Sequence, residues 1–210
     1  MPDHHDSSME RHAMWRTEFE QKGKAERSVK SVSGRKGERG KVYRLGIGIM
    51  LVGLAMSSGW STGTGFQRDP SWNLPVVGGG RSSLADLRGH VVIASFGATW
   101  CPPCRAELPA LQALADRYRG KRVKVVWISI DGEDVPDEKL AQFTAELGVS
   151  IPVLRDANGS VFAQFHQTSI PILVVIDQDG RLVGEPHVGF AGKEAFLKKM
   201  AEIIDRLLAR

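Results

Sequence analysis

Short apolar runs alternate with amphipathic segments over roughly the last two thirds of the chain. Residues 91–96 (VVIASF) are almost continuously apolar, which is typical of a strand buried on both faces. Residues 123–130 and 172–176 predict two further strands. Three amphipathic helices are expected where apolar positions recur at helical spacing, over residues 105–118, 136–147 and 192–208. The alternation of strands and helices indicates an α/β domain.

Residues 172–183 predict an antiparallel hairpin. The apolar strand 172–176 is followed by Asp-Gln-Asp-Gly at 177–180 and then by a short return arm over 181–183. Asp-Gly is a favoured pair for a tight hairpin turn, because such turns need positive φ angles. We therefore place the turn at Asp179-Gly180.

A different pattern precedes this domain. Residues 45–66 contain no charged side chain, and residues 45–56 are strongly apolar. Six Lys or Arg residues lie between positions 30 and 44, so the positive-inside rule places this flank in the cytoplasm and residues after about 60 outside. An uncleaved signal anchor and a cleaved signal peptide both remain open, since Ala-Met-Ser at 55–57 suits a signal peptidase.

Composition and charge exclude two classes of protein. Hydrophobic residues make up 42% of the chain and 23 of its 210 residues are glycine, so the chain as a whole is not disordered. The net charge is +4, but residues 1–44 carry eleven Lys or Arg against seven Asp or Glu, which leaves seventeen of each sign in the rest. A neutral domain lacks the basic surface that binds phosphates, so no nucleic-acid partner is expected.

The two cysteines of the chain, Cys101 and Cys104, lie in the sequence Trp-Cys-Pro-Pro-Cys directly before a predicted helix. Thiols at i and i+3 of a helical turn share one face within bridging distance. The helix N-terminus favours the thiolate of the first cysteine, so Cys101 is the expected nucleophile and Cys104 resolves the mixed disulfide. A purely structural disulfide would stabilise little, because it closes so short a loop. Zinc would need two further ligands, and His166 and His187 are poor candidates, so no metal and no cofactor are expected.

The motif and its surroundings resemble a known family. The order strand, Trp-Cys-Pro-Pro-Cys, helix, strand, helix, Ile170-Pro171, hairpin and helix looks like a thioredoxin fold. Within that fold, the chain is similar to the TlpA/ResA-like membrane-anchored thiol–disulfide oxidoreductases, through LADLRG at 84–89, CRAELP at 104–109 and IDQDG at 176–180. The resemblance implies an α/β thioredoxin-like fold, a central mixed sheet flanked by helices, preceded by one N-terminal membrane segment.

The resemblance also implies a role for Glu107. In this family a glutamate at the matching position tunes the active-site thiols and assists proton transfer, which makes Glu107 the third expected catalytic residue beside Cys101 and Cys104. The alternative is an acidic residue that faces solvent and is favoured only by the helix dipole. Ser95 supports the catalytic interpretation, because it stands where thioredoxins place a buried carboxylate.

Pro171 matches the cis-proline of the family, with an ordinary trans proline at a strand start as the alternative. A cis bond here would bring the Ile170 backbone beside Cys101, where it could pair with an extended client peptide. The residues expected to contact the client are Trp100, Pro102, Pro103, Ile170 and Pro171.

Two features of the sequence around the motif bear on the site, and the first is a departure from the family pattern. Gly97 replaces an aromatic residue, and we expect this replacement to leave space near the motif. Pro102 and Pro103 supply neither a charged nor an imidazole donor to the Cys101 thiolate, which predicts a site toward the reducing end of the family range.

These observations divide the chain into four parts: a disordered basic cytoplasmic tail at 1–44, a signal anchor or signal-peptide segment at 45–60, a linker at 61–70 and a thioredoxin-like domain at 71–210. The expected location is the cytoplasmic (inner) membrane, in a single pass, with the catalytic domain on the extracytoplasmic or periplasmic side. A cleaved periplasmic form is the alternative.

The leading functional hypothesis is a reductase of client disulfides outside the cytoplasmic membrane. By resemblance, its clients would be apocytochrome c or a copper-site subunit of an oxidase, and its electron donor an integral-membrane thiol protein. A general disulfide oxidant or isomerase and a non-enzymatic copper chaperone are the alternatives. A peroxidase is less favoured, because that chemistry needs no vicinal cysteine pair.

Overall fold

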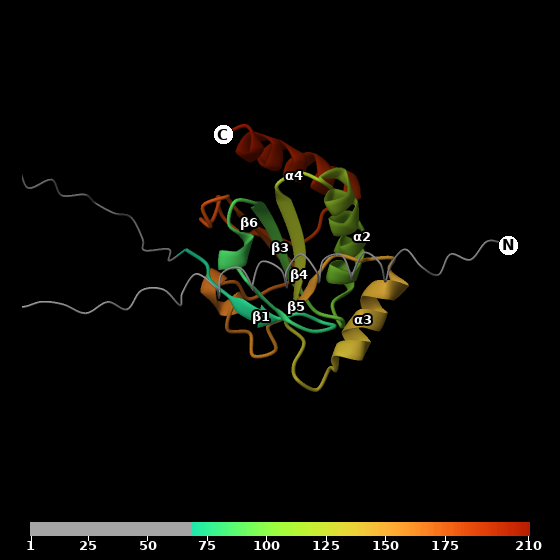
Figure 1. The fold of residues 1–210 in the computed structure, drawn as a ribbon. Coiled ribbons are helices and arrows are strands. Elements are labelled where there is room, and N and C mark those ends of the chain that lie inside the picture. Colours follow the sequence, from blue (N-terminus) through green and yellow to red (C-terminus); the bar gives the residue numbers. More distant parts are fainter. Residues whose placement is uncertain (1–68) are drawn as a thin grey trace, which may run out of the picture.

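The computed structural model describes residues 69–210, which form an α/β domain around one mixed sheet (Figure 1). The predicted tail (1–44), membrane segment (45–60) and most of the linker (61–70) lie outside the described residues. The central sheet has five strands in the order β5-β4-β3-β6-β7. Their bounds are β3 Val91–Gly97, β4 Val123–Ser129, β5 Val153–Arg155, β6 Ile172–Ile176 and β7 His187–Val188.

The pairing of the strands confirms the predicted mixed sheet. β3 lies at the centre, parallel to β4 and antiparallel to β6, while β5 pairs parallel with β4 and β7 pairs antiparallel with β6. The three expected helices are present, with bounds close to those predicted: α2 Pro102–Arg117, α3 Asp137–Glu146 and α4 Lys193–Leu208. The pattern did not predict six short elements. They are the strands β5 and β7 given above, β1 Asn73–Pro75, β2 Arg81–Ser83 and the 3-10 helices η1 Ala85–Leu87 and η2 Phe162–Phe165.

Alternate residues of β3 serve two different cores, because successive side chains of a strand point to opposite faces. Val91 and Ile93 pack with residues of α2, α3 and α4 on one face. Val92, Ala94 and Phe96 pack on the other face with residues of β1, η1 and η2. All seven residues of β3 are buried, which confirms the expectation of a strand covered on both sides.

The face covered by the helices positions the motif. Leu108, Leu111 and Leu114 of α2 are fully buried against the sheet, and burial of each contributes about 2 kcal/mol to the free energy of unfolding. Ser95 and Gly97 lie on the same side of β3 as Val91 and Ile93. The last two residues on this face of β3 therefore point toward the first turns of α2.

The predicted hairpin after β6 is present, but its return arm is interrupted. Asp177 N–H donates to the Arg181 carbonyl, and Gly180 has a φ of 85°, as the turn requires. Leu182 then makes a single bridge to Ile176, and regular pairing with β6 resumes at β7.

Within residues 69–210, no helix combines the length and the hydropathy that a membrane crossing needs.

Candidate active site

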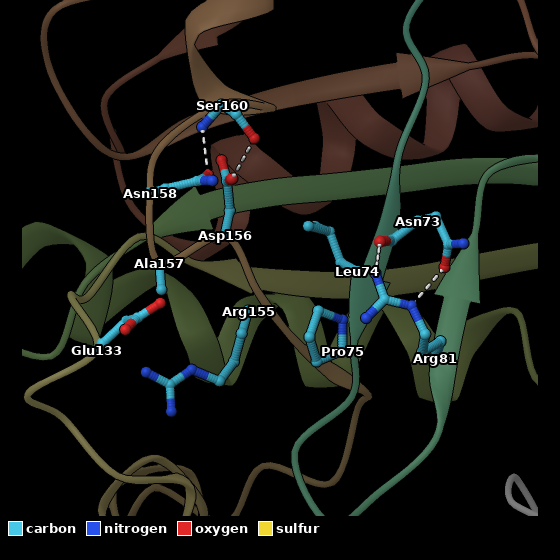
Figure 2. Close-up of a pocket in the computed structure, with 10 residues that line it drawn as sticks. All are labelled: Asn73, Leu74, Pro75, Arg81, Glu133, Arg155, Asp156, Ala157, Asn158 and Ser160. Carbon is cyan, nitrogen blue, oxygen red and sulfur yellow. Dashed lines mark hydrogen bonds between the residues drawn. The ribbon is translucent and has the colours of Figure 1, made fainter.

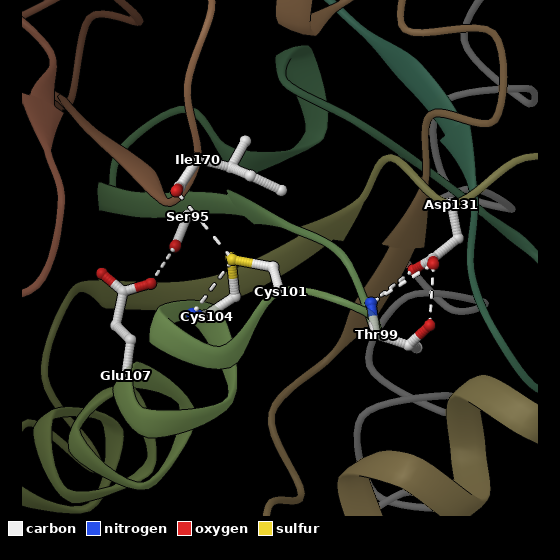
Figure 3. The surroundings of a disulfide bond; sticks show 7 residues. All are labelled: Ser95, Thr99, Cys101, Cys104, Glu107, Asp131 and Ile170. Carbon is white, nitrogen blue, oxygen red and sulfur yellow. Dashed lines mark hydrogen bonds between the residues drawn. A yellow bond between two sulfur atoms is a disulfide. The ribbon is translucent and has the colours of Figure 1, made fainter.

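The two cysteines lie at the start of α2 and are joined by a disulfide, with a Cα–Cα distance of 5.3 Å (Figure 3). Cys101 is the N-cap residue, and its Sγ accepts a hydrogen bond from the Cys104 backbone N–H at 3.3 Å. Pro102 and Pro103 have no N–H, so Cys104 supplies the first free backbone donor of the helix. The helix N-terminus therefore directs one N–H to the sulfur of the expected nucleophile.

The exposed surface of the two cysteines differs only slightly. Cys101 keeps 4% of its surface accessible and Cys104 none. Cys101 remains the residue that a partner can reach, because it alone retains access to solvent. Attack on or from Cys101 thus requires the partner to approach closely through the loops that surround it.

The residues expected to contact a client gather around Cys101. The Ile170–Pro171 peptide bond is cis, and the Ile170 carbonyl oxygen lies 3.9 Å from Cys101 Sγ. Trp100 is 69% exposed, and it lines a hollow of about 390 Å³ together with residues of α2 and α3. Pro102 and Pro103, the first two residues of α2, are exposed. The structure therefore brings Trp100, Pro102, Pro103 and Ile170 to the surroundings of one sulfur.

Glu107 is buried, so the solvent-facing alternative is wrong. Its side chain is 1% exposed, and its Oε2 accepts a hydrogen bond from Ser95 Oγ at 2.6 Å (Figure 3). Burial raises the pKa of Glu107 from its ordinary value of 4.5 to about 7, although the Ser95 hydrogen bond opposes part of that rise. A carboxyl with such a pKa, one turn after Cys104 on the same helix, suits proton exchange near neutral pH.

A second buried carboxyl, which the sequence analysis missed, fixes the loop before the cysteines. Asp131 accepts hydrogen bonds from Thr99 N–H at 2.9 Å and from Thr99 Oγ1 at 2.8 Å (Figure 3). It accepts a further one from Ser129 Oγ at 2.7 Å. It follows the end of β4, the parallel neighbour of β3. The carboxyl ends of parallel strands meet at one edge of the sheet, and this is the signal that could have identified Asp131.

The expectation that Gly97 leaves space near the motif is wrong. A Cβ atom at Gly97 would lie 2.8 Å from Trp127 Nε1, 3.0 Å from Cys104 Cβ and 3.2 Å from Cys104 Sγ. The indole of Trp127, from the neighbouring strand β4, already fills this volume. Gly97 is therefore required by a close approach rather than marking a gap.

A pocket of about 480 Å³ lies away from the cysteines, between the β1–β2 hairpin and the loop after β5 (Figure 2). Its two arginines are engaged: Arg81 donates to the Asn73 side chain and carbonyl, and Arg155 donates to Asp137 and to the Gly132 carbonyl. These bonds hold the pocket walls together. Among the residues that the structure describes, no group of three or more His, Cys, Asp or Glu side chains is placed to hold a metal ion.

The position of the Cys101–Cys104 disulfide at the start of α2 determines the reaction that it can carry out. A disulfide whose outer sulfur caps a helix can be opened by a thiol and closed again from the buried sulfur, so this chain is a thiol–disulfide oxidoreductase with a thioredoxin-like fold. Residues 67–184 match the model of the AhpC/TSA family, and the chain belongs to that family.

Comparisons with individual proteins agree with this class. The thioredoxin-like protein YneN of Bacillus subtilis is 29% identical over 163 residues, which are 73% of this chain and 94% of YneN. The thiol-disulfide oxidoreductase ResA of Bacillus anthracis is 28% identical, over a match that covers 72% of this chain and 93% of ResA. These relatives confirm the resemblance to ResA-like oxidoreductases.

Two solved structures support the fold. A thiol:disulfide interchange protein of the thioredoxin family from Chlorobium tepidum superposes with a TM-score of 0.55 at 28% identity, over 66% of this chain and 94% of that one. StoA from Bacillus subtilis superposes with a TM-score of 0.53, over 64% of this chain and 98% of StoA. StoA is 21% identical, so it supports the fold alone.

Proposed function

We propose that this protein reduces disulfides of client proteins on the outer side of the cytoplasmic membrane. The proposed clients carry paired cysteines that later bind haem or copper, as in apocytochrome c or a copper-site subunit of an oxidase. The proposed electron donor is an integral-membrane thiol protein. The apolar segment at 45–60 with its basic flank supports the location, and the similarity to the thiol-disulfide oxidoreductase ResA supports the disulfide chemistry. The type of client follows from the family resemblance of the sequence.

The observation that carries the reducing direction is the sparse stabilisation of Cys101 Sγ. Within residues 69–210, the backbone N–H of Cys104 is the one N–H that donates to this sulfur. Arg105 does not assist, because its guanidinium lies over the Phe143 ring, 5.3 Å from its centroid, and 3.9 Å from a Glu146 oxygen. A weakly stabilised thiolate leaves the reduced form a strong electron donor, whereas strong oxidants of this superfamily stabilise theirs.

The proposed reaction transfers two electrons to the client. The Cys101 thiolate attacks one sulfur of the client disulfide, which forms a mixed disulfide and releases the other client sulfur as a thiolate that takes up a proton. Cys104 passes its proton to the Glu107 carboxylate and attacks Cys101 Sγ. The Cys101–Cys104 bond forms, the bond between Cys101 and the client breaks, and the second client thiol leaves reduced.

The surroundings of Cys101 suit an extended client segment. The backbone at Ile170 lies beside Cys101 and offers hydrogen-bonding groups to a peptide that adds alongside it. Trp100 and the hollow next to it offer an apolar contact for a side chain near the client cysteine. We infer that Trp100, Pro102, Pro103, Ile170 and Pro171 form the client-binding surface.

Trapping the covalent intermediate in cells tests the proposal. Cys104→Ser should accumulate a mixed disulfide between Cys101 and the client, because the thiol that resolves it is absent. Cys101→Ser is the matched control and should accumulate none. The trapped partner, identified by mass spectrometry, should be an extracytoplasmic protein with haem-ligand or copper-ligand cysteines.

Other trapped partners would give different answers. Many unrelated extracytoplasmic proteins would replace the reductase with a general oxidant or isomerase, and cytoplasmic partners would overturn the location. Equal trapping by both variants would reverse the assignment of the two cysteines. Trapping by neither, with tight Cu(I) binding by the parent protein, would replace the enzyme with a copper chaperone.

A further inference from the structure

The indole of Trp127 is fully buried beside Gly97, close to the reactive disulfide, and its N–H lacks a hydrogen-bond partner within residues 69–210. Trp127 is 0% exposed, and its Nε1 has no hydrogen-bond partner among the described residues. The position that a Cβ of Gly97 would occupy is 2.8 Å from this nitrogen and 3.2 Å from Cys104 Sγ. The unpaired donor and the buried sulfur therefore border the same small space beside Gly97.

The sheet holds the indole in this place. Trp127 pairs in register with Ser95 of β3, so both side chains lie on the face of the sheet that α2 covers. On its other side the indole packs against the Phe143 ring of α3, at a centroid distance of 5.9 Å. A side chain fixed between a helix and a glycine has little freedom to turn its N–H to another partner.

A buried N–H without a partner costs free energy, and native proteins rarely keep one without a reason. In the disulfide form, Cys104 Sγ carries no charge and is a weak acceptor. In the reduced form, the same sulfur must become a thiolate before it can resolve the mixed disulfide. A thiolate is a strong acceptor, and a hydrogen bond to a charged group is about twice as strong as one between neutral groups.

We propose that Trp127 donates its indole N–H to the Cys104 thiolate when the disulfide opens, and so stabilises the nucleophile of the resolving step. The proposal rests on the resolving role of Cys104 given above. Glu107 accepts the proton that leaves Cys104, while Trp127 stabilises the charge left on the sulfur. The N–H bond itself stays intact throughout the step.

The role of Gly97 follows from this arrangement. Any larger residue would place a Cβ 2.8 Å from Nε1, which is too close, and 3.2 Å from Cys104 Sγ, which is a tight contact. A glycine at this position leaves open the space that both the indole N–H and the sulfur border.

The test measures Cys104 directly, without a client. In a Cys101→Ser background, the rate of Cys104 alkylation by iodoacetamide is followed against pH, with and without Trp127→Phe. Loss of the N–H should move the midpoint of this profile to higher pH and lower the rate at neutral pH about tenfold. Trp72→Phe is the matched control, because Trp72 is also buried with an unpartnered indole N–H but packs in the other core.

A second measurement does not depend on how the variants fold. In the full-length ¹⁵N-labelled Cys101→Ser protein, the Trp127 indole N–H resonance should move downfield as Cys104 ionises, while the Trp72 resonance stays in place. Identical alkylation profiles with and without Trp127→Phe, or equal shifts in the Trp72 and Trp127 variants, would overturn the proposal. A Trp127 indole resonance that does not shift when Cys104 ionises would also overturn the proposal.

The outcome is distinguishable from failure of the proposed function. If the trapped clients show an oxidant or isomerase, Cys104 still resolves the mixed disulfide and the alkylation profile still reports on Trp127. If the two cysteines exchange roles in the trapping experiment, the proposal about Trp127 loses its basis even where the profile shifts.

Discussion

Two buried carboxyl groups flank the reactive loop, and they differ in how many donors they receive. Asp131 accepts two hydrogen bonds from Thr99 and one from the hydroxyl of Ser129. Glu107 accepts one, from Ser95. Both side chains are 1% exposed, so burial alone does not separate them.

The different numbers of hydrogen-bond donors suit Asp131 and Glu107 to different roles. A carboxylate with three donors replaces the water it has lost and serves as a fixed point, here for the loop that carries Trp100 and Cys101. A carboxyl with one neutral donor is poorly compensated as an anion, which is why burial raises the pKa of Glu107 to about 7. Such a group can gain or lose a proton at neutral pH without rearranging the fold.

The largest effect on stability is expected from removing the carboxyl group of Asp131, which holds the loop before the cysteines. Asp131→Ala leaves the Thr99 N–H and two hydroxyl groups without their acceptor and should lower the free energy of unfolding by about 4 kcal/mol. Asp131→Asn is the control, since it keeps one oxygen acceptor and should cost about half as much. Urea unfolding of the oxidised protein measures both, and an Asp131→Ala variant as stable as the parent would remove the distinction between the two carboxyls.

Glu107→Gln should change how stability depends on pH. The raised pKa means that the folded protein holds the proton of Glu107 from pH 4.5 to about 7 while the unfolded chain has released it. This contribution is full below pH 4.5 and declines as pH rises through 7, so the parent should lose about 3 kcal/mol from this group by pH 8.

The glutamine variant cannot titrate, so its urea unfolding curves should lack that decline. In the reduced protein, the same variant should slow release of the client from the mixed disulfide and alter the pH dependence of thiol reactivity. Parallel stability profiles for parent and variant, with unchanged thiol reactivity, would return Glu107 to a structural role.

The smallest effect is expected from Ser95→Ala. Loss of one hydrogen bond should cost about 1 kcal/mol. Because the Ser95 hydroxyl lowers the pKa of Glu107, its removal should also extend the decline in stability to a pH above 7. Ser129→Ala is the matched control, since it removes a hydroxyl from Asp131 and should cost a similar amount without moving the decline. The same pH shift in both variants would contradict the comparison.

The sequence alone predicts the parts of the fold that long periodic segments encode. The apolar run at β3 and the helical spacing in α2, α3 and α4 set these elements within a few residues of their observed bounds. The strands β1, β2 and β5 have three residues each, which is too short for a period of two to stand out. β1 and β2 pair with each other across a short turn, whereas β5 pairs with β4, which lies on the other side of α3 in the chain.

The residues of the candidate site also divide into those that local sequence patterns indicate and those that they do not. The cysteine pair can be recognised in the sequence because both residues belong to one helical turn. Glu107 can be placed near the pair because it lies three residues after Cys104. Asp131 reaches Thr99 across 32 positions, so no local pattern indicates the contact. The expectation about Gly97 failed for the same reason, because the side chain that fills its space comes from another strand.

The alternation along β3 has a consequence for anyone who wishes to redesign this enzyme. Val92, Ala94 and Phe96 face the core that contains no cysteine, whereas Ser95 and Gly97 face the sulfur atoms and Glu107. Substitutions at the first set would alter thermal tolerance, and substitutions at the second would alter redox behaviour. One strand of seven residues thus offers two nearly independent sets of positions for engineering, interleaved residue by residue.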